Sequence, residues 1–234
     1  MYEPENEQLL AGGAQTTGVV RVGATVRRPA HPRSIFVDEL LRGLEAVGFD
    51  GASRALGYDA RGRQVVSYVE GSVPRVSPFG LSDGQLRSAA GLVLRYHDAT
   101  ATLSLRGGQD VVCHGDLGPH NMVFRGNSAV ALIDWDEVSP GRRAEDFAHA
   151  VWCCADLLEP AVPVTEQVRK AQLMCEAYPG MSPAIVKVEL DTRFRHARDE
   201  HAAAGRTRAV EVFDQLLATL HARSDDLGST SHFQ

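Results

Sequence analysis

Short apolar runs separated by glycines dominate the N-terminal part of the chain. Residues 9–28 read LLAGGAQTTGVVRVGATVRR, in which β-branched pairs alternate with polar residues and with Gly12-Gly13, Gly18 and Gly23. β-branched residues favour extended backbone, and glycine favours the tight turns that join antiparallel strands. The pattern therefore predicts three short strands in this segment.

A helical pattern follows the strands. In residues 35–47, apolar side chains recur near the three- or four-residue spacing of one helix face, and Gly48 is a suitable C-terminal cap. Residues 53–71 return to short apolar runs around a turn at residues 59–62. This second segment predicts two further strands, which end in a hinge at residues 67–71.

The pattern changes in the second part of the chain. Residues 73–84 contain two prolines and two glycines, which break regular structure. Ser82 is a suitable N-cap for a following helix, and residues 145–223 are also mostly helical in pattern. We therefore predict a mixed α/β (α+β) fold with a small β-rich N-terminal lobe, residues 1–70, and a mostly helical C-terminal lobe, residues 71–234.

Composition narrows the classes of protein to consider. With 234 residues, 44% of them apolar, the chain can bury one substantial core or two smaller ones. The net charge of −6 disfavours nucleic acid as a partner. Apolar runs such as Val111–Cys113 are too short to span a membrane, so we expect no membrane partner and a cytoplasmic location. The four cysteines form no Cys-x-x-Cys pair and are expected to be buried thiols.

The most informative stretch lies between the helical segments. Residues 113–121 read CHGDLGPHN and directly follow two valines, so polar groups gather at the end of a predicted buried strand. Phosphoryl transfer to a hydroxyl needs one carboxylate to orient the acceptor, and a carboxylate with an amide oxygen to hold Mg²⁺ against the nucleotide phosphates. Asp116 suits the first role. Asn121, five residues later, and Asp134, after the next strand, suit the metal.

These residues resemble a known family. The residues that carry the resemblance are His114-Gly115-Asp116, Asn121, Ile133-Asp134-Trp135-Asp136 and Asp146. They are similar to the motifs of the aminoglycoside phosphotransferase and choline kinase-like family. The resemblance implies a protein-kinase-like bilobal fold and ATP-dependent transfer of the γ-phosphoryl group to a small-molecule hydroxyl. The acceptors that it implies are aminoglycosides or other antibiotics and amino alcohols, so antibiotic resistance is one expected role.

The resemblance also implies where the nucleotide binds. ATP would lie between the lobes, with its adenine on the hinge backbone of Ser67, Tyr68 and Val69. Its phosphates would lie under the strand turn at residues 12–18, which begins with Gly12 and Gly13, although this segment lacks a glycine-rich phosphate-binding motif.

The phosphate-binding lysine of the family is absent here. Arg27 and Arg28 occupy its place, and alternation along a strand sends their side chains to opposite faces. We expect Arg28, on the face of Val26, to bind the phosphates, because arginine can also pair with them. Its acidic partner on the following helix is expected to be Glu39, with Asp38 as the alternative.

Two residues near the catalytic aspartate are expected to have supporting roles. His114 should brace the loop through a hydrogen bond, and Asp146 should cap a helix or hold the loop. The acceptor itself is expected to be cationic, because the chain is acidic and its last helices contain many carboxylates. These carboxylates belong to Asp156, Glu159, Glu166, Glu176, Glu189 and Asp191.

Other functions are less consistent with the sequence. A degenerate kinase fold that binds a nucleotide or a partner without turnover is the main alternative, because the usual lysine is missing. A protein kinase is disfavoured, because no Ala-Pro-Glu and no room for an activation segment follow Asp134. A serine hydrolase is disfavoured by the absence of Gly-x-Ser-x-Gly.

Overall fold

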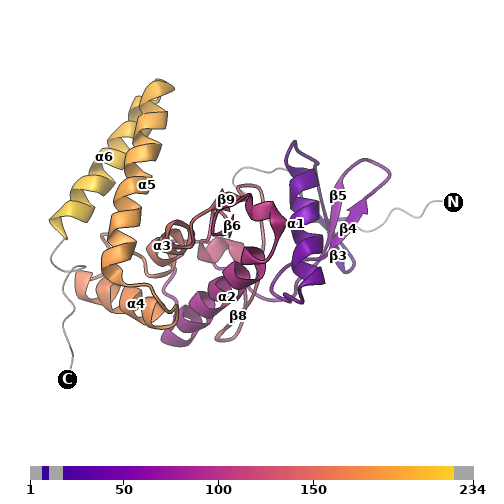
Figure 1. Cartoon of the computed structure of the whole chain (residues 1–234), viewed down its shortest axis with the longest axis horizontal. Helices are drawn as coiled ribbons and strands as arrows, with labels where there is room; N and C mark the ends of the chain where they lie inside the picture. The colour runs from indigo at the N-terminus through magenta and orange to yellow at the C-terminus, as the bar shows by residue number, and fades with distance from the viewer. Residues whose placement is uncertain (1–6, 11–17, 224–234) are drawn as a thin grey trace.

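The computed structural model describes residues 7–10 and 18–223, in a sheet-rich N-terminal part and a helical C-terminal part (Figure 1). The strands are β1 (Gln8–Leu9), β2 (Val20–Val22), β3 (Thr25–Arg28), β4 (Ala55–Tyr58), β5 (Gln64–Ser67), β6 (Val111–Cys113), β7 (Met122–Arg125), β8 (Ser128–Leu132) and β9 (Ser139–Gly141). The α-helices are α1 (Ser34–Ala46), α2 (Asp83–Ala101), α3 (Arg143–Cys154), α4 (Val164–Glu176), α5 (Pro183–Ala203) and α6 (Thr207–Ala222). Two short 3₁₀ helices, η1 (Ser104–Arg106) and η2 (Pro119–Asn121), complete the described elements.

The N-terminal part is an antiparallel sheet with the strand order β1-β2-β3-β5-β4. Strands β2 and β3 lie within residues 9–28, where three strands were predicted, while β1 overlaps that segment only at Leu9, and residues 11–17 lie outside the described residues. Strands β4 and β5 correspond to the two predicted in residues 53–71. The register pairs Arg28 with Gln64 and Thr25 with Ser67. The end of β3 therefore lies beside the start of β5, and the start of β3 lies beside the hinge.

Helix α1 confirms the predicted helix over residues 35–47. Val37, Leu40, Leu41 and Leu44 lie on one face and are buried. Gly48 ends the helix with φ +80° and donates its backbone N–H to the Glu45 carbonyl, as expected of a glycine cap. The helix lies between the sheet and α2 (Figure 1).

The C-terminal part packs around α2. Ser82 accepts a hydrogen bond from the Gln85 backbone, and the Gln85 side chain reaches back to the Ser82 N–H, which confirms the predicted N-cap. Strand β6 pairs with β9, and β7 forms a hairpin with β8. The sequence did not predict β9, because Ser139-Pro140-Gly141 has little strand propensity and forms only against β6.

Helices α5 and α6 form a long pair at the end of the molecule opposite the sheet (Figure 1). Much of this pair is exposed, and only Leu217 and Leu220 of α6 are buried. No helix in residues 7–10 and 18–223 is long and apolar enough to cross a membrane.

The segment after β5 connects the two parts of the molecule. Ser72 pairs with Phe124 of β7 through two backbone hydrogen bonds of 2.9 and 2.8 Å. Gly71 makes this approach possible, because a Cβ atom there would lie 2.5 Å from a Val123 methyl group. The hinge is therefore held against the hairpin that follows the CHGDLGPHN loop. The division of the chain at residues 70 and 71 stays a prediction.

Candidate active site

A cavity of about 240 Å³ lies between the sheet and the β7–β8 hairpin. Six of the predicted site residues line it: Arg28, Ser67, Tyr68, Val69, Asn121 and Asp134. Asp116 lies beside the cavity, where it contacts Asn121. Gly12 and Gly13 lie outside the described residues.

The walls of the cavity are mostly aliphatic. Val26 and Val66 of the sheet line one part, and Val123 and Ile133 line another. Within the described residues, the backbone N–H of Val69 has no hydrogen-bond partner. Flat aliphatic walls beside a free backbone donor are well suited to a heteroaromatic base.

Arg28 extends from β3 across the cavity to the segment after β8. Its guanidinium lies 3.4 Å from Asp134 Oδ1 and also forms an ion pair with Asp136. The residue is only 8% exposed. Asp134 adopts φ +65°, a left-handed conformation that is costly for a residue with a side chain and is often retained at functional sites.

The prediction that Glu39, or else Asp38, of the following helix pairs with Arg28 is wrong. Asp38 of α1 is buried and accepts a hydrogen bond of 2.6 Å from Gln64, while Glu39 is exposed. Arginine is longer than the usual lysine and carries two terminal nitrogens, so it reaches the two carboxylates at positions 134 and 136. The sequence motif contained Asp136, but no role was predicted for it.

The loop after β6 brings three of the predicted residues together. The Asn121 side-chain nitrogen donates to the Asp116 backbone carbonyl at 2.9 Å and to Asp116 Oδ2 at 2.8 Å. The Ile133 N–H donates to the Asn121 carbonyl at 3.0 Å, which places Asp134 next to this loop. Asn121 Oδ1 accepts no hydrogen bond from the described residues, so the amide oxygen is free for a ligand.

Asp146 of α3 holds the backbone before Asp116. Its carboxylate accepts the N–H groups of His114 at 2.8 Å and Gly115 at 2.9 Å, and it lies 3.0 Å from His97 Nε2. Burial opposes ionisation of Asp146, but the hydrogen bonds from His97 and Gly115 outweigh it and lower the pKa of this carboxyl. The prediction that Asp146 holds the loop is confirmed.

His114 has the bracing role that was predicted. Its Nε2 lies 3.0 Å from the Ile133 carbonyl, which can only accept, so the ring donates. Burial lowers the pKa of His114 and keeps the ring neutral. Gly115 adopts φ +85°, and a Cβ atom there would lie 2.5 Å from the Glu137 carbonyl, so the turn before Asp116 requires glycine.

Two histidines flank the carboxylate of Asp116. His120 Nε2 lies 3.3 Å from Asp116 Oδ2, and His149 Nε2 of α3 lies 3.7 Å from Oδ1. The hydrogen bond from His120 is the largest cause that lowers the pKa of Asp116 to about 2, so the carboxylate is ionised near neutral pH. Sequence reasoning missed His149. It lies one helical turn after Asp146, a spacing that could have indicated a shared helix face.

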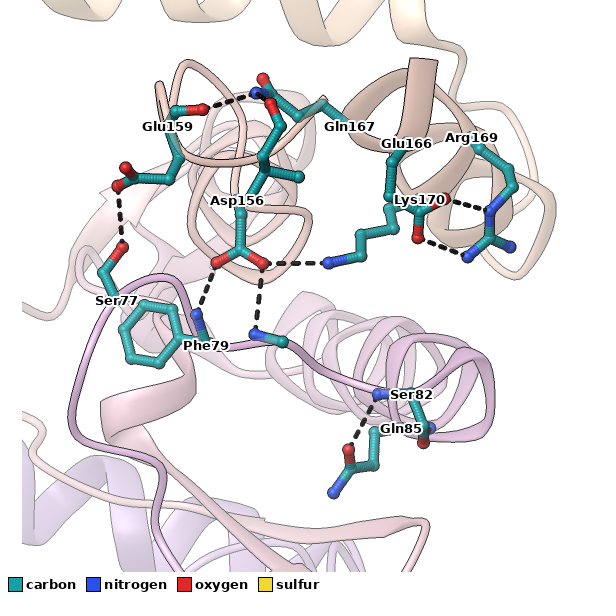
Figure 2. A network of polar contacts seen from close by, with 12 residues as sticks. Ser77, Phe79, Ser82, Gln85, Asp156, Glu159, Glu166, Gln167, Arg169 and Lys170 are labelled. Atoms are coloured by element: carbon teal, nitrogen blue, oxygen red, sulfur yellow. Dashed lines mark hydrogen bonds and ion pairs between the residues drawn. The ribbon is translucent and has the colours of Figure 1, made fainter. Parts of the chain in front are cut away.

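A polar network fixes the segment that contains Phe79 (Figure 2). Asp156 accepts the backbone N–H groups of Phe79 at 2.7 Å and Gly80 at 3.3 Å, and forms a buried ion pair of 3.0 Å with Lys170. The Phe79 ring stacks on His120 with 6.1 Å between the ring centres. Asp156 therefore holds a segment whose aromatic ring stacks on a residue of the loop that contains Asp116.

The carboxylates expected to receive a cationic acceptor already have partners in the chain. Five of the six form ion pairs: Asp156 with Lys170, Glu166 with Arg169, Glu176 with Arg87, Glu189 with Arg142, and Asp191 with Arg195 and His221. Glu159 accepts hydrogen bonds from Ser77 and Ala161. Because these carboxylates already have partners, they no longer support the argument for a cationic acceptor. The positive charge of the acceptor stays a prediction.

The oxygen donors beside the cavity fit Mg²⁺. Asp134 offers a carboxylate and Asn121 an amide oxygen, which are the hard ligands that Mg²⁺ takes together with waters and phosphate oxygens. The guanidinium of Arg28 on Asp134 shows that this position already attracts a cation. Within residues 7–10 and 18–223, no group of three or more His, Cys, Asp or Glu side chains could hold a metal ion.

Comparison with known proteins identifies relatives of the chain. The family model of the phosphotransferase enzyme family matches residues 39–184. The trifolitoxin immunity protein of Rhizobium leguminosarum bv. trifolii is 34% identical over 200 residues, which cover 76% of this chain and 75% of that protein.

Solved structures share the fold at much lower identity. The GDP complex of wild-type aminoglycoside 2′-phosphotransferase-IIIa has a TM-score of 0.64 at 10% identity, covering 93% of this chain and 92% of that chain. A choline/ethanolamine kinase family protein from Mesorhizobium loti has a TM-score of 0.56 at 16% identity, covering 97% and 89%. A macrolide 2′-phosphotransferase from Brachybacterium faecium has a TM-score of 0.55 at 15% identity, covering 92% and 91%. These likenesses confirm the predicted protein-kinase-like bilobal fold.

Proposed function

Because this chain belongs to the phosphotransferase enzyme family, we propose that it transfers the γ-phosphoryl group of a nucleoside triphosphate to a hydroxyl group of a small molecule. The observation that most supports this proposal is the contact of Asp116 with Asn121, next to Asp134 and beside the cavity. These are the three side chains that such a transfer requires.

The nucleotide would bind in the cavity. The hinge residues Ser67, Tyr68 and Val69 would hold the base through their backbone, between the aliphatic walls. The solved relatives include complexes with GDP and with ADP, which supports a nucleotide in this position. Arg28, at the end of β3, would bind the phosphates in place of lysine, and we propose ATP as the donor.

Asn121 and Asp134 would hold Mg²⁺ through their oxygens. A bound Mg²⁺ neutralises charge on the phosphates of the nucleotide. Arg28 would exchange its ion pair with Asp134 for contacts to the phosphates. Asp134, whose backbone is left-handed, already lines the cavity in which this exchange would take place.

Asp116 would orient the acceptor hydroxyl. With a pKa of about 2 it is an anion at neutral pH, so it accepts a hydrogen bond from the hydroxyl and takes its proton as the new bond forms. Asp146 holds the two preceding backbone N–H groups, and Asn121 holds Oδ2. Asp116 is thereby fixed before the acceptor binds.

The acceptor would be a hydroxyl-bearing antibiotic or toxin. The names of the relatives link them to aminoglycosides, a macrolide, and immunity to trifolitoxin. Solved relatives also include complexes with gentamicin and streptomycin, which supports a cationic acceptor. Phosphorylation adds negative charge to such a molecule and so alters its binding to its target.

One observation favours a second function. In this structure the guanidinium of Arg28 forms ion pairs with Asp134 and Asp136. The ion pair with Asp134 occupies the carboxylate that a metal–nucleotide complex would need. A chain that keeps this ion pair would bind a nucleotide or a partner without turnover.

ATP turnover decides between the two functions. The assay measures phosphate transfer, with and without Mg²⁺, to trifolitoxin, gentamicin, streptomycin and simple amino alcohols. The first function predicts Mg²⁺-dependent transfer to at least one of them. It also predicts that Asp116→Asn lowers kcat by roughly a hundredfold or more and leaves nucleotide affinity nearly unchanged.

Asp199→Asn is the matched control, because it makes the same chemical change to a carboxylate of α5 that is 71% exposed. Full activity in this variant shows that loss of a carboxylate alone does not inactivate the protein. No transfer to any acceptor, with nucleotide binding intact, would favour the binding function.

A further inference from the structure

The two oxygens of Asp116 have different surroundings. Oδ2 is held by the Asn121 side-chain nitrogen at 2.8 Å and lies 3.3 Å from His120 Nε2. Oδ1 accepts no hydrogen bond from the described residues and faces His149 Nε2 at 3.7 Å. Oδ1 is therefore the oxygen available to an acceptor hydroxyl, and His149 is its neighbour.

A second contact determines which nitrogen of His149 carries the proton. His149 Nδ1 lies 3.0 Å from the Gly115 carbonyl, which can only accept, so Nδ1 must be protonated. Nε2 then carries a lone pair. Burial and the charge of Arg193, whose guanidinium donates to the same carbonyl at 3.0 Å, lower the pKa of His149 to about 4. The carboxylates of Asp116 and Asp146 act in the opposite direction but do not prevent this, so the ring is neutral near pH 7.

Asp116 Oδ1 and His149 Nε2 are thus two hydrogen-bond acceptors, and none of the residues that the structure describes places a donor between them. A carboxylate that faces a nitrogen lone pair at 3.7 Å gains nothing in the free protein. A ligand with donors on two adjacent carbon atoms satisfies both, because gauche neighbours hold their donors close together, so that each can reach one acceptor at normal hydrogen-bond distance.

Resting on the proposed function, we propose that His149 is a specificity-determining residue that selects acceptors with a second hydroxyl or ammonium group on the carbon next to the phosphorylated hydroxyl. The hydroxyl would donate to Asp116, and its neighbour would donate to the lone pair of His149. Vicinal diols and 2-amino alcohols share this chemistry.

A purely structural role, in which His149 only holds Gly115, makes different predictions for two variants. Asparagine places an N–H near the position of Nδ1 and keeps the bond to the Gly115 carbonyl, but it has no group at the position of Nε2. Glutamine places an amide near Nε2, where it can accept, but loses the bond to Gly115. Selection through Nε2 therefore predicts that His149→Gln preserves the preference for vicinal acceptors and that His149→Asn loses it.

The first experiment is independent of turnover. Long-range ¹H–¹⁵N NMR spectra of the protein with labelled histidines report the protonation and hydrogen bonding of each ring nitrogen, and His149→Gln identifies the His149 signals.

The probes are trans-2-aminocyclohexanol and trans-1,2-cyclohexanediol, each compared with its 1,4 isomer. We expect an unprotonated Nε2 in the free protein and a shift of its resonance with at least one vicinal probe and with neither 1,4 isomer. Which of the two vicinal probes shifts the Nε2 resonance shows whether the second donor is an amine or a hydroxyl. A protonated Nε2, equal shifts with both isomers, or no shift with any probe would overturn the proposal.

The second experiment measures kcat/KM for the same four compounds with saturating Mg·ATP. We expect His149→Asn to lower the ratio of vicinal to 1,4 activity roughly fivefold, the effect of one neutral hydrogen bond, and His149→Gln to retain most of it. An unchanged ratio in His149→Asn would assign the residue to the Gly115 contact alone. A vicinal-specific NMR shift, with no transfer to these compounds or to the acceptors of the turnover assay, would refute the proposed transfer but not the selection by His149.

Discussion

Removal of Asp156 tests the network that supports the loop containing Asp116. Its carboxylate is 0% exposed and pairs with Lys170, which is 8% exposed, at 3.0 Å. Asp156→Ala leaves a buried ammonium without its counter-ion, which costs about 3–5 kcal/mol of the free energy of unfolding. For a chain of this size, 1 kcal/mol shifts Tm by about 2–4 °C, so we expect Tm to fall by roughly 6–20 °C.

Thermal and urea unfolding of the variants measure this cost. The double variant Asp156→Ala/Lys170→Met is the control, because it removes both charges and should recover most of the loss. A single variant within about 1 kcal/mol of the wild type, or a double variant less stable than the single one, would refute the reasoning. Because Asp156 also holds the backbone of Phe79, whose ring stacks on His120, the KM of the acceptor should rise more than that of the nucleotide.

Three further predictions concern the cavity and its surroundings. Arg28→Ala should weaken nucleotide binding, measured by calorimetry, roughly tenfold or more. Arg27→Ala should weaken it much less, because Arg27 does not line the cavity. The reverse order would contradict the assignment of Arg28 to the phosphates. Asp134→Ala should raise the Mg²⁺ concentration for half-maximal activity, and an unchanged Mg²⁺ titration would place the metal elsewhere. The pKa of His149 is lowered to about 4 in the folded protein, so between pH 6.5 and 4 this side chain binds a proton in the unfolded chain but not in the folded one. Acidification in this range should therefore destabilise the wild type more than His149→Gln. Parallel Tm curves for the two proteins would show that His149 does not titrate in this way.

Much of the fold was predictable because it depends on local sequence. The glycine-separated runs of β1 to β3, the apolar face of α1 and the capping box of Ser82 and Gln85 each depend on neighbours a few residues away. The loop from His114 to Asn121 is equally local, so a five-residue spacing was enough to place an amide beside a carboxylate.

Contacts between distant parts of the chain were not predictable in the same way. β9 forms a strand only because β6 offers an edge, and its own residues have little strand propensity. The six acidic residues were individually visible, although Asp156 and Glu159 lie between α3 and α4 and not in a helix. Whether their charges are free depends on partners up to 89 residues away, as for Glu176 and Arg87.

By itself, the sequence determined the β-rich and helical parts of the chain, the family and the three side chains expected to act at the hydroxyl and the metal, because each depends on residue type and short spacing. Tertiary structure decided which groups surround them. Arg28 pairs with Asp134 and not with a residue of α1, although Arg28 and Asp134 are 106 residues apart in the sequence. His149 reaches Asp116 only because α3 packs on the loop that Asp146 holds. Such pairings follow from how the helices and sheets pack, and packing is set by the whole buried surface, which no local pattern contains.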